Sequence, residues 1–191
     1  MKVYRRVLFG IATLGTVFIA LTIYISTAQS SAKASEKAED FFCAMYSADP
    51  ETFSAFIETD LNETFEEAEQ SLLALETEVN TRYKGLCTEA FHQMVMGNRL
   101  WQIAPMAANK MDAVLSVEEV ILNRVNPDDE DVYFNFEIKI KAVNQSNGQV
   151  LQYVEKGQIR LTFENFGYRV NSLKFTRNDL IKNVMNRFGY L

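Results

Sequence analysis

Few side chains in this sequence could do acid–base, metal or nucleophilic chemistry. His92 is the only histidine, and its neighbours Phe91 and Met94 favour a partly buried structural position over catalysis. A metal site needs several converging ligands, and no HExxH spacing or close cysteine pair accompanies His92. Nucleophile-elbow and glycine-rich phosphate-binding motifs do not occur either. The sequence therefore predicts no catalytic residue, no metal and no cofactor.

Four ionisable side chains on predicted strands are candidates for an acid or base inside an apolar pocket: Tyr133, Glu137, Tyr153 and Glu155. An enzyme of this kind needs one such group buried, because burial shifts its pKa. However, the segment Val132–Ile140 places all its polar side chains on one face, and its apolar face carries no ionisable group. An enzyme is therefore the less favoured interpretation.

Cys43 and Cys87 both lie in apolar helical contexts, FFCAMY and GLCTEAF. The favoured interpretation is that each is a small buried core residue. The alternative is a disulfide that joins two helices in an oxidising compartment.

The N-terminal segment predicts the topology of the chain. The run Val7–Ile25 (VLFGIATLGTVFIALTIYI) is uncharged and close to the ~20 residues that a membrane-spanning helix needs. Lys2, Arg5 and Arg6 precede it, and positive charge there holds the N-terminus in the cytoplasm. We therefore expect residues 1–28 to form a cytoplasmic n-region and transmembrane anchor of a single-pass cell-membrane protein. Residues 29–191 would form an extracytoplasmic domain.

A cleaved signal peptide is the alternative interpretation of the same segment. The tripeptide Ala32-Lys33-Ala34 could serve as its small-residue cleavage site, with cleavage after Ala34. The apolar run is longer than the ~7–15 residues typical of signal peptides, so we expect the anchor to be retained.

Charge is unevenly distributed along the chain, whose net charge is −6. Acidic residues dominate Glu36–Glu78, where Lys37 is the only cation, and the later half is roughly neutral. This balance argues against direct nucleic-acid binding. A small basic interaction patch in the C-terminal part is a candidate, with ordinary surface cations as the alternative: Arg169, Lys174, Arg177, Lys182 and Arg187.

The first half of the domain has helical periodicity. Ser30–Ser47 carries one apolar stripe, made of Ala38, Phe41, Phe42, Met45 and Tyr46. The predicted elements that follow are a helix restart at Asp49-Pro50 with a short helix to Asp60, an amphipathic helix from Phe65 to Gly85, a helix from Thr88 to Gly97 with Phe91, Met94 and Val95 inward, and a loop or short turn over Asn98–Asp112.

The second half changes to a period of two, which is typical of strands. Four strands are predicted, at Ala113–Val125, Val132–Val143, Val150–Glu164 with a bulge at Gly157, and Tyr168–Phe175, and a C-terminal helix at Asn178–Arg187. The turn residues Asn126–Asp129, Ser146–Gly148 and Asn165–Gly167 separate them. The predicted class is α+β: a transmembrane helix, then helices packed on a curved four-stranded antiparallel sheet, like a cone.

The order of these elements resembles the nuclear transport factor two-like (cystatin-like cone) superfamily. The resemblance rests on AEDFFCAMYSADPETFSAFI, similar to the family's opening helix, Asp-Pro restart and second helix, and on the late meander that ends at YRVNSLKF. With its short N-terminal anchor, the chain is similar to the bitopic VirB-eight-like assembly factors of type IV secretion and conjugation in bacteria.

That resemblance implies a non-catalytic scaffold that forms homo-oligomers and joins other proteins of an envelope complex. Two further functions stay open. A tethered module that binds a ligand or a peptide would need an open apolar cavity between helices and sheet. A pocket enzyme, similar to isomerases and dehydratases of the superfamily, would also need a buried acid or tyrosine in that cavity.

Overall fold

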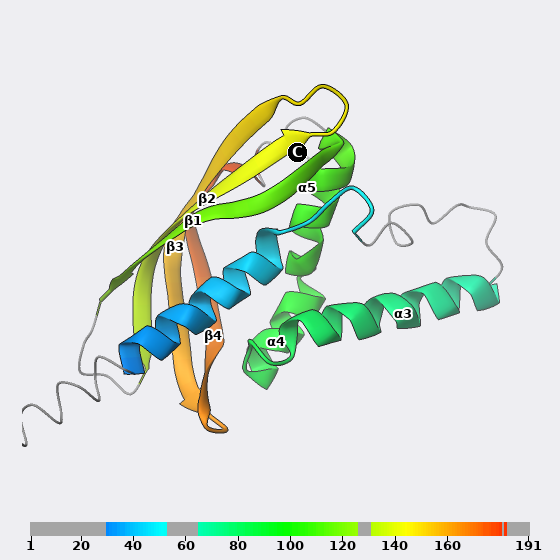
Figure 1. Ribbon diagram of the computed structural model, residues 1–191. Helices are drawn as coiled ribbons and strands as arrows, with labels where there is room; N and C mark the ends of the chain where they lie inside the picture. Colours follow the sequence, from blue (N-terminus) through cyan, green and yellow to red (C-terminus); the bar gives the residue numbers. More distant parts are fainter. Residues whose placement is uncertain (1–29, 53–64, 126–130, 181, 183–191) are drawn as a thin grey trace, which may run out of the picture.

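A computed structural model of the chain describes residues 30–52, 65–125, 131–180 and 182 (Figure 1). Four antiparallel strands form one sheet in the order β1-β2-β3-β4. The strands are β1 (Ala113–Arg124), β2 (Val132–Asn144), β3 (Val150–Glu164) and β4 (Gly167–Asn178). The four predicted strands are confirmed. The helices precede the strands in the chain, so the predicted α+β class is confirmed as well.

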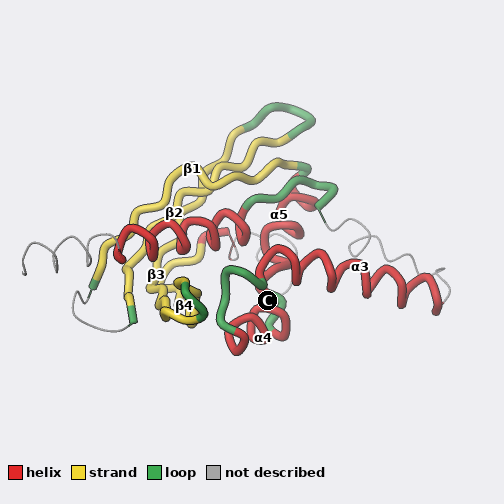
Figure 2. The backbone as a smooth tube through the Cα atoms, turned by 60° about the horizontal axis from the view of Figure 1, so that its bottom comes forward, coloured by secondary structure: helices red, strands yellow, loops and turns green. Residues whose placement is uncertain are grey.

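The helices lie on one face of the sheet, and none of the described helices covers the other face (Figures 1 and 2). They are an unlabelled helix over residues 30–46, α3 (Phe65–Tyr83), α4 (Glu89–Gly97), the short 3-10 helix η1 (Leu100–Gln102) and α5 (Ile103–Met111). We call the face toward the helices the inner face and the opposite one the outer face.

The helix over residues 30–46 packs one apolar face into the core. Its buried side chains are Ala34, Ala38, Phe41, Phe42, Met45 and Tyr46. They recur every three or four residues and so form one stripe. The stripe predicted from the sequence is confirmed, and it begins one turn earlier than predicted.

Helix α4 begins where its cap predicts. The hydroxyl of Thr88 accepts a hydrogen bond from the backbone N–H of Phe91 at 3.3 Å, which satisfies one of the free donors of the first turn. Phe91 and Val95 are buried as predicted. The prediction for Met94 is wrong, because this side chain faces outward and is 38% exposed.

The segment after Gly97 forms helices instead of the predicted loop. Pro105 lies in the first turn of α5, where its missing N–H has no intrahelical partner to lose. The side chains that face the core are small, chiefly Ala104, Ala107 and Ala108. Small residues give a weak apolar period, and for that reason the sequence pattern missed this helix.

The sheet has irregularities that bend it. The register shifts in β1–β2 between Val117 and Glu119, and in β3–β4 at Lys156/Gly157 and Arg160/Leu161. Bulges of this kind increase the local twist of a sheet. The predicted bulge at Gly157 is therefore confirmed.

Both edge strands are tied to the helical half at one point. Leu115 of β1 exchanges two backbone hydrogen bonds with Ala48, of 3.1 and 2.7 Å. On the other edge, Val170 of β4 bonds to Leu86 and Thr88 through its backbone N–H and C=O, at 2.8 and 2.9 Å. These bridges fix the position of the helices relative to the sheet.

Several predictions concern residues outside the described part of the chain. They include the anchor with Lys2, Arg5 and Arg6, the short helix to Asp60, the turn Asn126–Asp129 and most of the C-terminal helix, of which residues 179, 180 and 182 are helical. Within the described residues, no helix has the length and apolar composition needed to cross a membrane.

Candidate functional site

The inner face of the sheet carries one fully buried acid, Glu155 of β3. It lies on the same face as Tyr153 and Gly157, because alternate residues of a strand share a face. One carboxyl oxygen, Oε1, accepts a hydrogen bond from the backbone N–H of Leu180 at 2.8 Å. Leu180 lies where the chain becomes helical after β4. Glu155 thus caps the start of this helix from inside the core.

The second carboxyl oxygen of Glu155 has a different environment. Oε2 of Glu155 and the hydroxyl of Tyr46 are both buried without a hydrogen-bond partner among the described residues. Burial raises the pKa of Glu155 to about 7, although the hydrogen bond from Leu180 and the charge of Arg177 act to lower it. Burial, and then the charge of Glu155, raise the pKa of Tyr46 well above its ordinary value. A carboxyl group with a pKa near neutrality can give or take a proton at physiological pH.

The structure separates the four candidate acid–base residues of the sequence. Glu155 and Tyr153 lie on the inner face, and the Tyr153 hydroxyl is 3.2 Å from Sδ of Met111. Glu137 lies on the outer face, where Lys156 donates a hydrogen bond of 2.6 Å to it and lowers its pKa. Tyr133 is also on the outer face. Tyr46 was missed because its spacing assigns it to the apolar stripe, which does not reveal that its hydroxyl is buried.

His92 does not join the Glu155 site. It is half-buried on α4, and its Nε2 has no hydrogen-bond partner among the described residues. Within that same part of the chain, no three His, Cys, Asp or Glu side chains form a group that could hold a metal ion.

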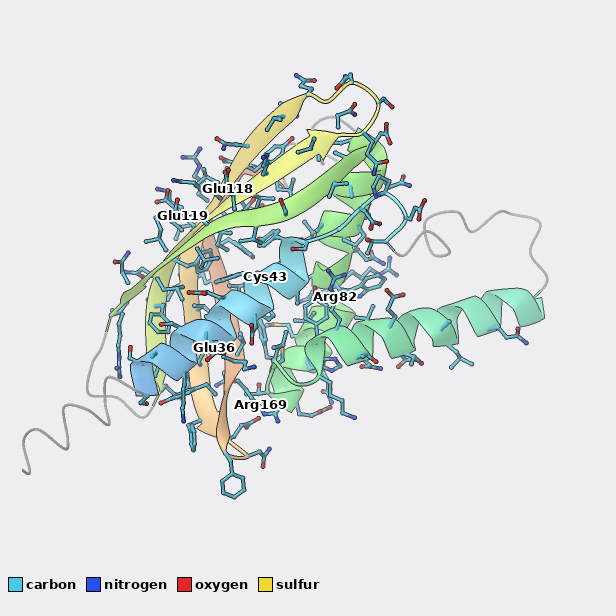
Figure 3. All side chains as sticks on the ribbon, viewed as in Figure 1. Glu36, Cys43, Arg82, Glu118, Glu119 and Arg169 are labelled. Atoms are coloured by element: carbon cyan, nitrogen blue, oxygen red, sulfur yellow. The ribbon has the colours of Figure 1, made fainter. Side chains whose placement is uncertain are left out.

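The outer face of the sheet is polar and charged. Ion pairs connect neighbouring strands: Lys139 of β2 with Glu119 of β1, and Lys156 of β3 with Glu137 of β2. Their side chains are about one-third to one-half exposed, so solvent screens each pair and it contributes little stability. Figure 3 labels Glu118 and Glu119 on β1, on this side of the molecule. The pairs thus give the outer face an alternating charge pattern.

An open depression of about 410 Å³ lies on the outer face at the Gly157 bulge. Its lining includes Lys156 and Lys174 and the amides of Asn135 and Gln158. Gly157 has no side chain, so the ring of the inner-face residue Phe136 also lines the depression. At this place a core side chain is reached from the outer face.

The described members of the predicted basic patch make separate contacts. Arg169 donates to the backbone C=O of Lys84 at 3.0 Å and lies 3.7 Å from Glu164. Arg177 forms a two-pronged ion pair with Asp179. The other three members are Lys174, on the depression, Lys182, which is exposed, and Arg187, which lies outside the described residues.

Cys43 and Cys87 are both free thiols in the structure. Cys87 is 2% exposed, and burial raises its pKa to about 12. The prediction of a buried Cys43 is wrong: this residue lies on the solvent side of its helix, opposite the stripe of Phe41 and Phe42. Figure 3 shows Cys43 on the helix over residues 30–46, about two turns along from Glu36.

This difference in exposure predicts selective labelling of the two thiols. In the folded chain at pH 7.5, a maleimide is expected to modify Cys43 at least tenfold faster than Cys87, because reaction needs access as well as thiolate. Mass spectrometry of peptides after timed quenching measures both rates, with Cys43→Ser as the matched control. Equal rates in the folded chain, or a Cys43–Cys87 disulfide in protein isolated without reductant, would contradict it.

Comparisons with known proteins were made for the whole chain. No protein-family model and no curated protein sequence matches it.

Proposed function

We propose that this chain is a membrane-anchored, non-catalytic scaffold of a multiprotein envelope complex. The complex we favour is a type IV secretion or conjugation channel, because the order of elements resembles that of its VirB-eight-like assembly factors. The observation that carries the proposal is the filling of the space between helices and sheet. A scaffold needs a rigid domain with free outer surfaces, whereas a ligand module or pocket enzyme needs an open cavity.

Aromatic rings occupy the space where an open cone would hold a ligand. The rings of Phe42 and Phe136 connect helix and sheet, with centroids 4.8 Å apart. Phe41 contacts Phe42 at 5.8 Å and Phe91 at 5.9 Å, and Phe136 contacts Phe175 at 5.8 Å. Rings at these separations are in tilted or edge-on contact. The interior thus supports a solid core.

The outer surfaces supply what association requires. The outer face carries a pattern of exposed charges, and within the described residues each edge strand has one isolated backbone bridge to the helical half. Long edge strands can pair with another chain. These surfaces are suited to contacts with other proteins. The proposed partners are further copies of this chain and other proteins of the envelope complex.

Site-directed photo-crosslinking of the full-length protein in its native membrane tests the scaffold. A crosslinking amino acid at Ser116, exposed on β1, is expected to capture a second copy and several membrane proteins. The same amino acid at Gln93, exposed on α4, is the matched control and should capture fewer. A chain that remains monomeric and captures nothing from either position would overturn the proposal.

A second candidate function rests on the buried Glu155 and its unpartnered oxygen. A small ligand with a hydroxyl or amide group could satisfy both Oε2 and the Tyr46 hydroxyl. A thermal-shift screen of uncharged polar compounds tests this function. Compounds that stabilise the wild type but not Glu155→Gln would favour a ligand-binding module over a scaffold.

A further inference from the structure

The turn between β3 and β4 holds an aromatic ring in solvent. Asn165 and Phe166 have φ values of +50° and +65°, the left-handed pair typical of a tight two-residue hairpin. Asparagine and glycine are the residues that such a turn favours, and a bulky side chain there is an outlier. Phe166 nevertheless occupies the second position and is 100% exposed. Strain of this kind tends to mark functional positions.

Two more aromatic side chains flank the turn. Phe163, 56% exposed, contacts Tyr168 edge-on, with ring centroids 5.2 Å apart. Glu164 is the acidic residue of this segment. Its Oε1 lies 3.7 Å from Nε of Arg169, so the positive charge of Arg169 offsets the negative charge of Glu164. We call Phe163, Phe166 and Tyr168 the aromatic tip. Figure 1 shows the β3–β4 turn projecting from the lower end of the sheet, and no described segment covers it.

The aromatic tip lies beside the point where the described chain begins. The hydroxyls of Tyr168 and Ser30 form a hydrogen bond, and Ser30 is the first described residue of its helix. The apolar run ends at Ile25, five residues earlier. Five residues span at most about 17 Å. A bilayer that holds residues 7–25 would therefore lie within reach of the tip.

We propose that the aromatic tip inserts into the interfacial layer of the membrane that holds the anchor, and so fixes the orientation of the domain on that membrane. Aromatic rings concentrate at the boundary between headgroups and hydrocarbon, and the tip brings three of them to one place. The inference rests on the membrane attachment in the proposed function. A second contact beside the anchor would restrict the domain to one tilt.

The experiment uses the full-length chain reconstituted into phosphatidylcholine/phosphatidylglycerol vesicles that contain lipids brominated near the headgroup. Tryptophan replaces Phe166 in one variant and Val150 in the matched control. Val150 is 51% exposed at the other end of β3, roughly 45 Å from the tip at ~3.3 Å per residue. The native Trp101, 6% exposed, contributes equally to both variants.

Brominated lipid is expected to reduce the added fluorescence of Phe166→Trp at least twofold and to leave that of Val150→Trp unchanged. Flotation of the vesicles in a density gradient separates two failures. A chain that floats while Phe166→Trp is quenched only by aqueous acrylamide would overturn the tip inference and leave the anchor intact. A chain that does not float would overturn both. Protection of Phe166→Trp from lipid and acrylamide alike would assign the tip to a protein contact instead.

Discussion

Replacement of Gly157 by alanine is expected to lower the free energy of unfolding by about 3 kcal/mol, the upper range for overpacking a core. A Cβ at this position would lie 2.0 Å from the backbone oxygen of Lys174 and 2.8 Å from Cζ of Phe136. The Lys174 oxygen belongs to β4, which pairs with β3 at this point, so it cannot rotate away as a side chain could. Relief requires the two strands to separate locally.

Urea unfolding of the detergent-solubilised chain, followed by the fluorescence of the buried Trp101, measures this effect. Gly85→Ala is the matched control, because no atom lies within 4 Å of a Cβ built at Gly85. Its stability is expected to stay equal or to rise by about 0.5 kcal/mol, as the unfolded chain loses freedom. Equal unfolding midpoints for Gly157→Ala and Gly85→Ala would show that the bulge has room for a side chain.

The strands were predictable because their signals are local. Alternation in β2 assigns Val132, Phe134, Phe136, Ile138 and Ile140 to one face, and all five are buried. The hairpin residues Asn147 and Gly148 end the strand where their turn geometry requires, with Gly148 at φ +69°. A period of two and a turn residue act within a few positions of each other, so both can be read without knowing what packs against the sheet.

Contacts between distant segments could not be predicted in the same way. The α3 pattern predicts an amphipathic helix, and the helix exists, yet Leu73 is 57% exposed, and the buried α3 residues among the described side chains, Val79 and Tyr83, lie in its last turns. Periodicity indicates which side of a helix is apolar but not which part meets a partner. Figure 1 shows that the earlier part of α3 projects away from the sheet.

The candidate site illustrates the same limit. The sequence offered Glu155 together with Glu137, both acids on predicted strands. What distinguishes them is the register of β3 against its neighbours and the backbone N–H of Leu180, 25 residues later in the chain. That donor satisfies one oxygen of the buried Glu155, while Lys156 pairs with the partly exposed Glu137. Neither contact leaves a signature near the acid itself.

Glu155 is expected to make the stability of the fold fall as pH rises toward neutrality. Its pKa is about 7 in the folded chain, against an ordinary value of 4.5. Between these values the folded state holds a proton that the unfolded state has lost. The stabilisation is complete below pH 4.5 and is lost as pH rises through 7, a total of roughly 3 kcal/mol at 1.36 kcal/mol per pH unit.

Glu155→Gln should remove this slope, because glutamine is neutral throughout and nearly the same shape. Its Oε1 can still accept the hydrogen bond from Leu180. At pH 8 we expect the variant to be more stable than the wild type by roughly 2 kcal/mol. The other groups that act on this carboxyl, Asp179 and Arg177, stay charged across the range from pH 5 to 8.

Urea unfolding at half-unit intervals from pH 5 to 8 gives the comparison, with Glu137→Gln as the matched control. The pKa of Glu137 is lowered by Lys156, so its contribution is present above pH 4.5 and is lost only as the medium becomes more acidic. Glu137→Gln should therefore keep the wild-type slope between pH 5 and 8. Parallel curves for the wild type and Glu155→Gln would mean that the carboxyl is ionised inside the fold, and that water or a ligand satisfies Oε2. That result would favour an open pocket, and with it the ligand-binding function, over the scaffold.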